Sequence, residues 1–209
     1  MFLAKSRIEE LASGDMPLFD QDTYDAKCLQ QSSYDLRLGK QAYLVGDDAP
    51  VFLSDDKPYL TTPPGQFAIL TCLEKLNLPK NLMGFITLRF NWKMQGLVNI
   101  SGFHVDPTFK GILIFAVNNA GPSDIRLRFR ERTFTIFFAD VDGEIGSVRR
   151  EQTEPLEGIP LHLVQNLGGS SVTLTRLQKE IADLRTKMLI YAPLAVAALL
   201  ALLLNLLRH

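Results

Sequence analysis

The chain has 209 residues, of which 46% are hydrophobic and 22% are charged, proportions typical of an ordinary globular protein. Its 22 basic and 23 acidic residues give a net charge of −1, so no positive field favours nucleic acid as a partner. Cys28 and Cys72 lie far apart without the spacing of metal ligands, which favours two reduced, buried thiols over a metal site or a disulfide.

The N-terminal residues predict a short helix and no export signal. Charged residues interrupt the apolar positions of residues 1–15 too often for the hydrophobic region of a signal peptide. From Ser6 to Ala12 the apolar residues follow helical spacing. We expect Ser6 to cap this amphipathic helix and Gly14 to end it.

Short strand-like runs follow the helix. Residues 32–39 alternate between apolar and polar, and further runs occupy residues 41–45, 51–53 and 66–72, separated by turn-forming Gly, Pro and Asp. Many short strands with few helices, continuing to residue 142, predict a sandwich or barrel.

Residues 84–118 contain the clearest strand and one unusual carboxylate. The apolar run at residues 112–117 predicts a strand buried on both faces. Asp106 precedes Pro107, between two strand patterns. It either hydrogen-bonds its own turn, which is the more frequent role, or takes part in chemistry.

Arginines alternate with apolar residues at residues 124–130. Arg126, Arg128 and Arg130 share one face of the predicted strand, where they either contact solvent or bind phosphate. A solvated strand face is the more common use of such a pattern.

The composition changes after residue 142. Residues 143–170 are rich in Gly, Glu and Pro and predict a strap or linker, and residues 171–187 predict a short coiled coil. The predicted contact positions are spaced by three and four residues: Leu174, Leu177, Ile181, Leu184 and Met188. Such a short repeat needs help from neighbouring structure to associate.

Residues 188–207 are mostly apolar and lack charge, and about 20 such residues are enough to span a bilayer. A buried C-terminal helix is the alternative, but the segment has no polar face. Because Lys179, Arg185 and Lys187 precede the segment, we expect a single-pass, tail-anchored membrane protein with the large N-terminal domain in the cytoplasm.

The order and spacing of several motifs resemble the dCTP deaminase and dUTPase superfamily. The similar segments are QQSSYDLRLG (residues 30–39), PPGQFAILTCLEKLNLP (63–79), HVDPTFKG (104–111) and IRLRFRERTFTIFFADV (125–141). The resemblance implies a mainly β domain over residues 1–142, a distorted β-barrel or jelly-roll of the dUTPase type. It also implies a homotrimer with active sites between subunits.

The chain departs from the family where the chemistry is performed. The glutamate that transfers protons in the deaminases corresponds to Ala116, which has no ionisable group. The triphosphate-binding segment reads RFNWKMQGL, with Phe90 and Asn91 in place of two serines and Met94 in place of an arginine. The turn at residues 130–132 has gained a glutamate, and the C-terminal arm that closes over triphosphate in the enzymes is unrecognisable.

Other positions retain the family pattern. By resemblance, Asp106 is the catalytic residue if the chain is active, and the nucleotide-binding candidates are Asp35, Arg89, Asn91, Lys93, Gly96 and Lys110. Arg37 also matches the family. We expect no metal site and no cofactor, apart from Mg²⁺ accompanying a bound nucleoside triphosphate.

Two classes of function follow. The first is a membrane-anchored, catalytically degenerate homotrimer that senses a pyrimidine deoxynucleotide or binds a partner. The alternative is an active, membrane-tethered dCTP deaminase or dUTP pyrophosphatase. A structural trimer without a ligand is a third reading. Since fold resemblance alone does not establish activity, the site residues have to decide.

Overall fold

A computed structural model describes residues 1–146, 155–167 and 174–207, except for the side chains of residues 174–176, 178–179 and 201–206. The chain forms two compact units, residues 1–171 and 172–209. The predicted linker over residues 143–170 therefore lies partly outside the described residues.

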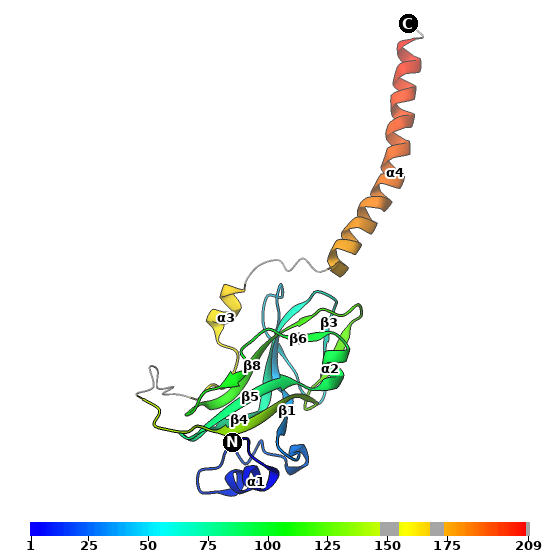
Figure 1. Ribbon diagram of the computed structural model, residues 1–209. Coiled ribbons are helices and arrows are strands. Elements are labelled where there is room, and N and C mark those ends of the chain that lie inside the picture. The colour runs from blue at the N-terminus through cyan, green and yellow to red at the C-terminus, as the bar shows by residue number, and fades with distance from the viewer. Residues whose placement is uncertain (147–154, 168–173, 208–209) are drawn as a thin grey trace. The chain divides into compact units, whose positions relative to one another are not determined.

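The first unit consists mainly of antiparallel strands (Figure 1). They are β1 (Tyr34–Leu44), β2 (Val51–Phe52), β3 (Tyr59–Thr62), β4 (Phe67–Asn77), β5 (Leu82–Leu88), β6 (Leu97–Asn99), β7 (His104–Val105), β8 (Lys110–Asn119), β9 (Ile125–Arg128) and β10 (Arg132–Asp140). The main sheet has the order β6-β8-β4-β1-β10-β5-β7, with β2 paired to β1, while β3 and β9 form a separate pair. Its helices are α1 (Lys5–Ser13), the 3₁₀ turn η1 (Ala26–Cys28), α2 (Phe90–Met94) and α3 (Leu161–Asn166).

Aromatic residues fill the interior of the sheet. The rings of Phe115 and Phe134 stack with centroids 3.6 Å apart, and Phe19 contacts Tyr34 at 4.4 Å. All four side chains are fully buried. Burial of such large apolar surfaces is the main favourable term in folding. The prediction of a mainly β domain is confirmed.

Helix α1 begins one residue before the predicted start. Its N-cap is Ala4, without a side-chain hydrogen bond, so the prediction that Ser6 caps it is wrong. The backbone amide of Lys5 donates instead to the carbonyl of Gln31, at 2.7 Å. Tertiary contacts of the chain start therefore replace the local cap.

Strand β8 is fully buried on one face and half-buried on part of the other. Ile112, Leu113, Phe115 and Val117 are buried, whereas Ile114 and Ala116 are partly exposed, so the prediction of burial on both faces is met only in part. The outer face is covered in part by α3, whose Val164 packs against Tyr43 and Ile69.

Residues 155–167, here called the strap, dock on the sheet. The amide of Ile112 donates to the carbonyl of Leu156 at 2.8 Å, and the amide of Leu156 donates to the carbonyl of Lys110 at 3.2 Å. Gly111 has φ +112°, and a Cβ there would lie 2.3 Å from the backbone of Leu156. A glycine is therefore required where the strap approaches β8.

The second unit is the single helix α4 (Leu174–Leu206), which contains Pro193. The predicted coiled coil over residues 171–187 and the predicted span over residues 188–207 are parts of this one helix. Leu177, Ile181 and Leu184 are largely exposed on it, and the coiled coil stays a prediction.

Among the residues covered by the structure, no helix carries an apolar run long enough to cross a membrane. The predicted membrane-spanning helix is therefore not supported.

A buried ion pair ties β1 to β4. Arg37 Nε donates to Glu74 Oε1 at 2.7 Å, and the Arg37 amide donates to Oε2 at 2.9 Å. Arg37 also donates to the Thr23 carbonyl and lies 3.4 Å from Asp25, which fixes the loop before η1 against the sheet. Burial raises the pKa of Glu74 despite the opposing effect of Arg37.

Substituting Glu74 by alanine should destabilise the fold by about 3–5 kcal/mol, because the Arg37 charge stays inside without its partner. Urea unfolding followed by circular dichroism measures this change. Glu10→Ala is the matched control, since Glu10 pairs with Arg7 at 2.7 Å on the surface. The control should leave the unfolding midpoint nearly unchanged, and equal midpoints for the two variants would contradict the structural role of the buried pair.

The turn after Asp106 places a β-branched residue in the left-handed region. Thr108 has φ +69°, a conformation that costs an L-residue roughly 1–2 kcal/mol. Thr108→Gly should therefore stabilise the protein by about 1 kcal/mol after allowing for the greater freedom of glycine in the unfolded chain. The same unfolding experiment on Thr61→Gly, in the extended strand β3, should show destabilisation. If Thr108→Gly instead lowers the free energy of unfolding, the backbone of Thr108 is not strained.

Candidate functional site

A buried carboxylate with two arginines lies where β1, β5 and β10 meet. Asp35 on β1 is only 3% exposed. Its Oδ1 accepts a hydrogen bond from Thr135 Oγ1 at 2.9 Å, and its Oδ2 accepts one from Gln30 Nε2 at 3.2 Å. Arg89 Nε lies 3.5 Å and an Arg132 guanidinium nitrogen 3.9 Å from Oδ2. These residues are here called the Asp35 cluster.

The backbone holds both arginines in place. Arg89 follows β5 and precedes α2, and its amide donates to the Thr133 carbonyl at 3.0 Å. Trp92 Nε1 donates to the Arg132 carbonyl at 3.1 Å, which joins α2 to β10. The side chains of Arg89 and Arg132 are 38% and 36% exposed. Each arginine side chain thus lies within ion-pair distance of Asp35 and is also partly exposed to solvent.

Three further predicted residues lie on helix α2 or directly after it. Asn91 and Lys93 are exposed on α2, within one helical turn of Arg89, and Gly96 follows it with φ +94°. Phe90 and Met94, one turn apart on α2, are 71% and 70% exposed. The surface next to Arg89 is therefore more apolar than a phosphate site requires.

Asp106 lies away from the Asp35 cluster within the chain. It follows β7, whose Val105 pairs with Gly84 of β5, so it is level with Met83. Six residues of extended strand separate that position from Arg89, about 20 Å. Asp106 is 78% exposed and its Oδ1 lies 3.5 Å from Nε2 of His104.

Lys110 and Ala116 belong to β8. Lys110 pairs with Asn77 of β4 at the start of the strand, so it also lies apart from Asp35. Ala116 lies opposite Ile69, and its carbonyl accepts hydrogen bonds from the amides of Ile100 and Ser101 at 2.8 and 3.2 Å. Its side chain can neither give nor take a proton.

The motif-based prediction missed Thr135, Gln30 and Arg132 as partners of Asp35. It also missed Glu74, although a signal was present. Residues 70, 72, 74 and 76 alternate as the buried face of β4, so a glutamate at position 74 falls on an apolar face. A charge at such a position needs a buried partner, and Arg37 supplies it.

Cys28 and Cys72 are free and buried, as expected, and burial raises the pKa of the Cys28 thiol. In the described ranges, no group of three or more His, Cys, Asp or Glu side chains could hold a metal ion.

Comparisons with known proteins agree with the fold. The chain is 33% identical over 122 residues to the dCTP deaminase of Thermococcus kodakarensis, covering 58% of this chain and 76% of the relative. It is 31% identical over 115 residues to the dCTP deaminase of Pyrococcus abyssi, covering 55% and 72%.

A solved structure shares the fold. The 2′-deoxycytidine 5′-triphosphate deaminase of Agrobacterium tumefaciens superposes with a TM-score of 0.54 at 21% identity, covering 66% of this chain. The chain spans about half of that protein, 47% of its length. A family model described as dCTP deaminase-like matches residues 3–141, well over half of the chain. The chain therefore belongs to the dCTP deaminase-like family.

Proposed function

We propose that this protein binds a pyrimidine deoxynucleotide at the Asp35 cluster without deaminating it, and that it acts as a catalytically degenerate nucleotide sensor or partner-binding protein. The observation that carries the proposal is Ala116 in the middle of β8. Attack of water on the cytosine ring needs a group that takes and returns protons. A methyl group does neither.

Retention of the Asp35 cluster supports binding. A guanidinium that is held by a buried carboxylate is pre-oriented and keeps further N–H donors for a phosphate. Arg89, with 38% of its side chain exposed, satisfies this description, whereas one guanidinium nitrogen of Arg132 already donates to the Lys27 carbonyl at 2.8 Å. Phe90 and Met94 supply no donor, so we expect weaker phosphate binding than a complete family site would give.

The assembly in this proposal is a homotrimer, as the family resemblance implies. Asp106 and Lys110, which lie apart from Asp35 in one chain, would then approach the cluster of a neighbouring subunit. Membrane attachment, a cytoplasmic N-terminal domain and Mg²⁺ accompanying a triphosphate all stay predictions.

An active pyrimidine deoxynucleotide enzyme is the second candidate. The exposed Asp106 beside His104 favours it, because a carboxylate next to an imidazole can orient an attacking water. Phosphate hydrolysis would not require a proton carrier at position 116. We rank this candidate second because the phosphate-binding segment has lost its hydroxyl donors.

Purified full-length protein should form no uridine nucleotide from dCTP, because position 116 has no proton carrier. Chromatography of the reaction products measures this, with the Thermococcus kodakarensis dCTP deaminase assayed in parallel. Formation of dUTP or dUMP that disappears in an Asp106→Ala variant would establish the enzyme and overturn the proposal.

Arg89→Ala should remove most of the rise in melting temperature that dCTP or dUTP produces, since Arg89 supplies charge for the phosphates. Differential scanning fluorimetry measures the shift. Arg126→Ala is the matched control, because Arg126 lies on β9 with its guanidinium 3.8 Å above the Tyr59 ring, away from the cluster. An unchanged shift in Arg89→Ala, with the fold intact by circular dichroism, would exclude the Asp35 cluster as the binding site.

A further inference from the structure

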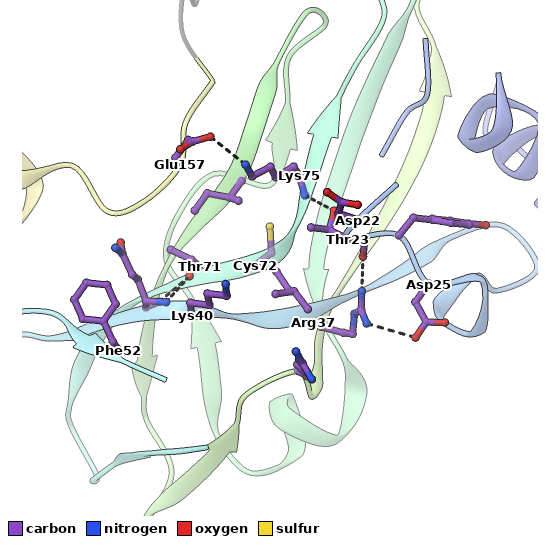
Figure 2. Close-up of a pocket in the computed structure, with 15 residues that line it drawn as sticks. Asp22, Thr23, Asp25, Arg37, Lys40, Phe52, Thr71, Cys72, Lys75 and Glu157 are labelled. Carbon is purple, nitrogen blue, oxygen red and sulfur yellow. Dashed lines mark hydrogen bonds and ion pairs between the residues drawn. The ribbon is translucent and has the colours of Figure 1, made fainter. Parts of the chain in front are cut away.

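A cavity of about 620 Å³ lies on β1 and β4, between the loop at residues 22–25 and the strap (Figure 2). Cavities of this size commonly hold small molecules. Asp35 and Arg89 are not among its lining residues. The cavity is therefore distinct from the Asp35 cluster, and the proposed function does not use it.

Three cations with weak or exchangeable partners line the cavity: Lys40, Lys75 and Arg130. Across the described part of the chain, the Lys40 ammonium has no ion pair or side-chain hydrogen bond. Arg130 forms an ion pair with the exposed Asp55, at 3.4 Å. Lys75 Nζ lies 3.0 Å from the Glu157 carboxylate. Arg37, by contrast, is fully engaged by Glu74 and the loop.

An aromatic ring and an apolar wall complete the cavity. Phe52 lines it with 65% of its surface exposed, next to Gln41 in the β1–β2 pairing. Leu73 and Ile112 contribute apolar surface. An exposed ring beside cations with weak or exchangeable partners suits a ligand that combines a flat aromatic group with a negative charge, because the ring stacks while the charge pairs.

The acidic residues restrict where the negative charge can lie. Asp22 and Asp25 line the side formed by the loop, and Asp25 lies 3.4 Å from Arg37. An anion is repelled there and is attracted to Lys40 and Arg130. It reaches Lys75 only by replacing Glu157, a carboxylate that is itself 70% exposed.

The strap makes two of its polar contacts with residues of the cavity wall. Glu157 pairs with Lys75, and the Ile159 amide donates to Gln41 Oε1 at 2.8 Å. Figure 2 shows Glu157 reaching from the strap to Lys75 at the cavity edge. Occupation of the cavity therefore acts directly on the contacts that hold this part of the strap.

We propose that this cavity is a second ligand site, which binds a nucleoside phosphate with its base on Phe52 and its phosphate on Lys40 and Arg130. The phosphate replaces the Glu157 carboxylate as the partner of Lys75. Residues 157–159 of the strap are thereby released from the sheet. The contacts of Leu156 with β8 and of Val164 with Tyr43 do not involve the cavity cations. The release is therefore local.

Isothermal titration of the full chain with AMP, GMP, CMP and UMP tests the site, with adenosine and inorganic phosphate as partial ligands. At least one nucleotide should bind more tightly than either partial ligand. Lys40→Met should weaken that binding at least tenfold and Glu157→Gln should strengthen it several-fold. Phe52→Ala should weaken binding of the nucleotide but not of inorganic phosphate.

Lys5→Met is the matched control, because Lys5 is an exposed lysine at the start of α1, away from the cavity. Absence of binding, or equal affinities for the Lys40 and Lys5 variants, would overturn the proposal. Loss of binding in Arg89→Ala alone would assign the ligand to the Asp35 cluster. That result refutes the second site and leaves the proposed function standing.

Hydrogen exchange tests the coupling to the strap. A saturating nucleotide should speed exchange of the Ile159 amide severalfold, while the Ile112 amide, bonded to Leu156, stays protected. If the Ile159 amide keeps its protection in the complex, the ligand does not displace the strap.

Discussion

Arg37 and Glu74 meet in the interior as a charged pair with a hydrogen bond at each carboxylate oxygen. Burying two charges is costly unless the geometry satisfies them, and here one arginine supplies both donors. The pair lies at the point where β1 changes partners. The pairing of β1 with β10 shifts register between Leu36 and Arg37, and the pairing of β1 with β4 begins at Leu38. A side chain that bridges β1 and β4 at this point holds the sheet together where the backbone ladders are irregular.

Both binding regions depend on this segment of β1. Asp35, two residues before Arg37 and on the same face of the strand, carries the cluster with Arg89 and Arg132. Lys40 and Gln41, a few residues later, line the cavity under the strap. One strand therefore positions a buried carboxylate at one end and an unpaired cation at the other.

The sheet of the dCTP deaminase-like family and the Asp35 cluster are both present in this chain. The buried Asp35 accepts hydrogen bonds from Thr135 and Gln30 and forms ion pairs with the two arginines. Positions 90, 94 and 116 are the apolar residues Phe, Met and Ala. By the family resemblance, a serine, an arginine and a glutamate are expected there. Exposed apolar residues on α2 cost the fold little, whereas loss of a buried charge partner would cost it much.

The amino-acid sequence by itself determined the class of the domain and the identity of its main motifs. Alternating apolar residues separated by Gly, Pro and Asp specify short strands, because the side chains of a strand face opposite sides in turn. The sequence also showed the missing ionisable group at Ala116. Only the tertiary structure decided which charges meet. Asp35 and Thr135 are one hundred residues apart, and only the pairing of β1 with β10 brings them together. Glu157 likewise reaches Lys75 at the edge of the cavity only because residues 155–159 return to the sheet, a contact between distant segments that no local pattern encodes.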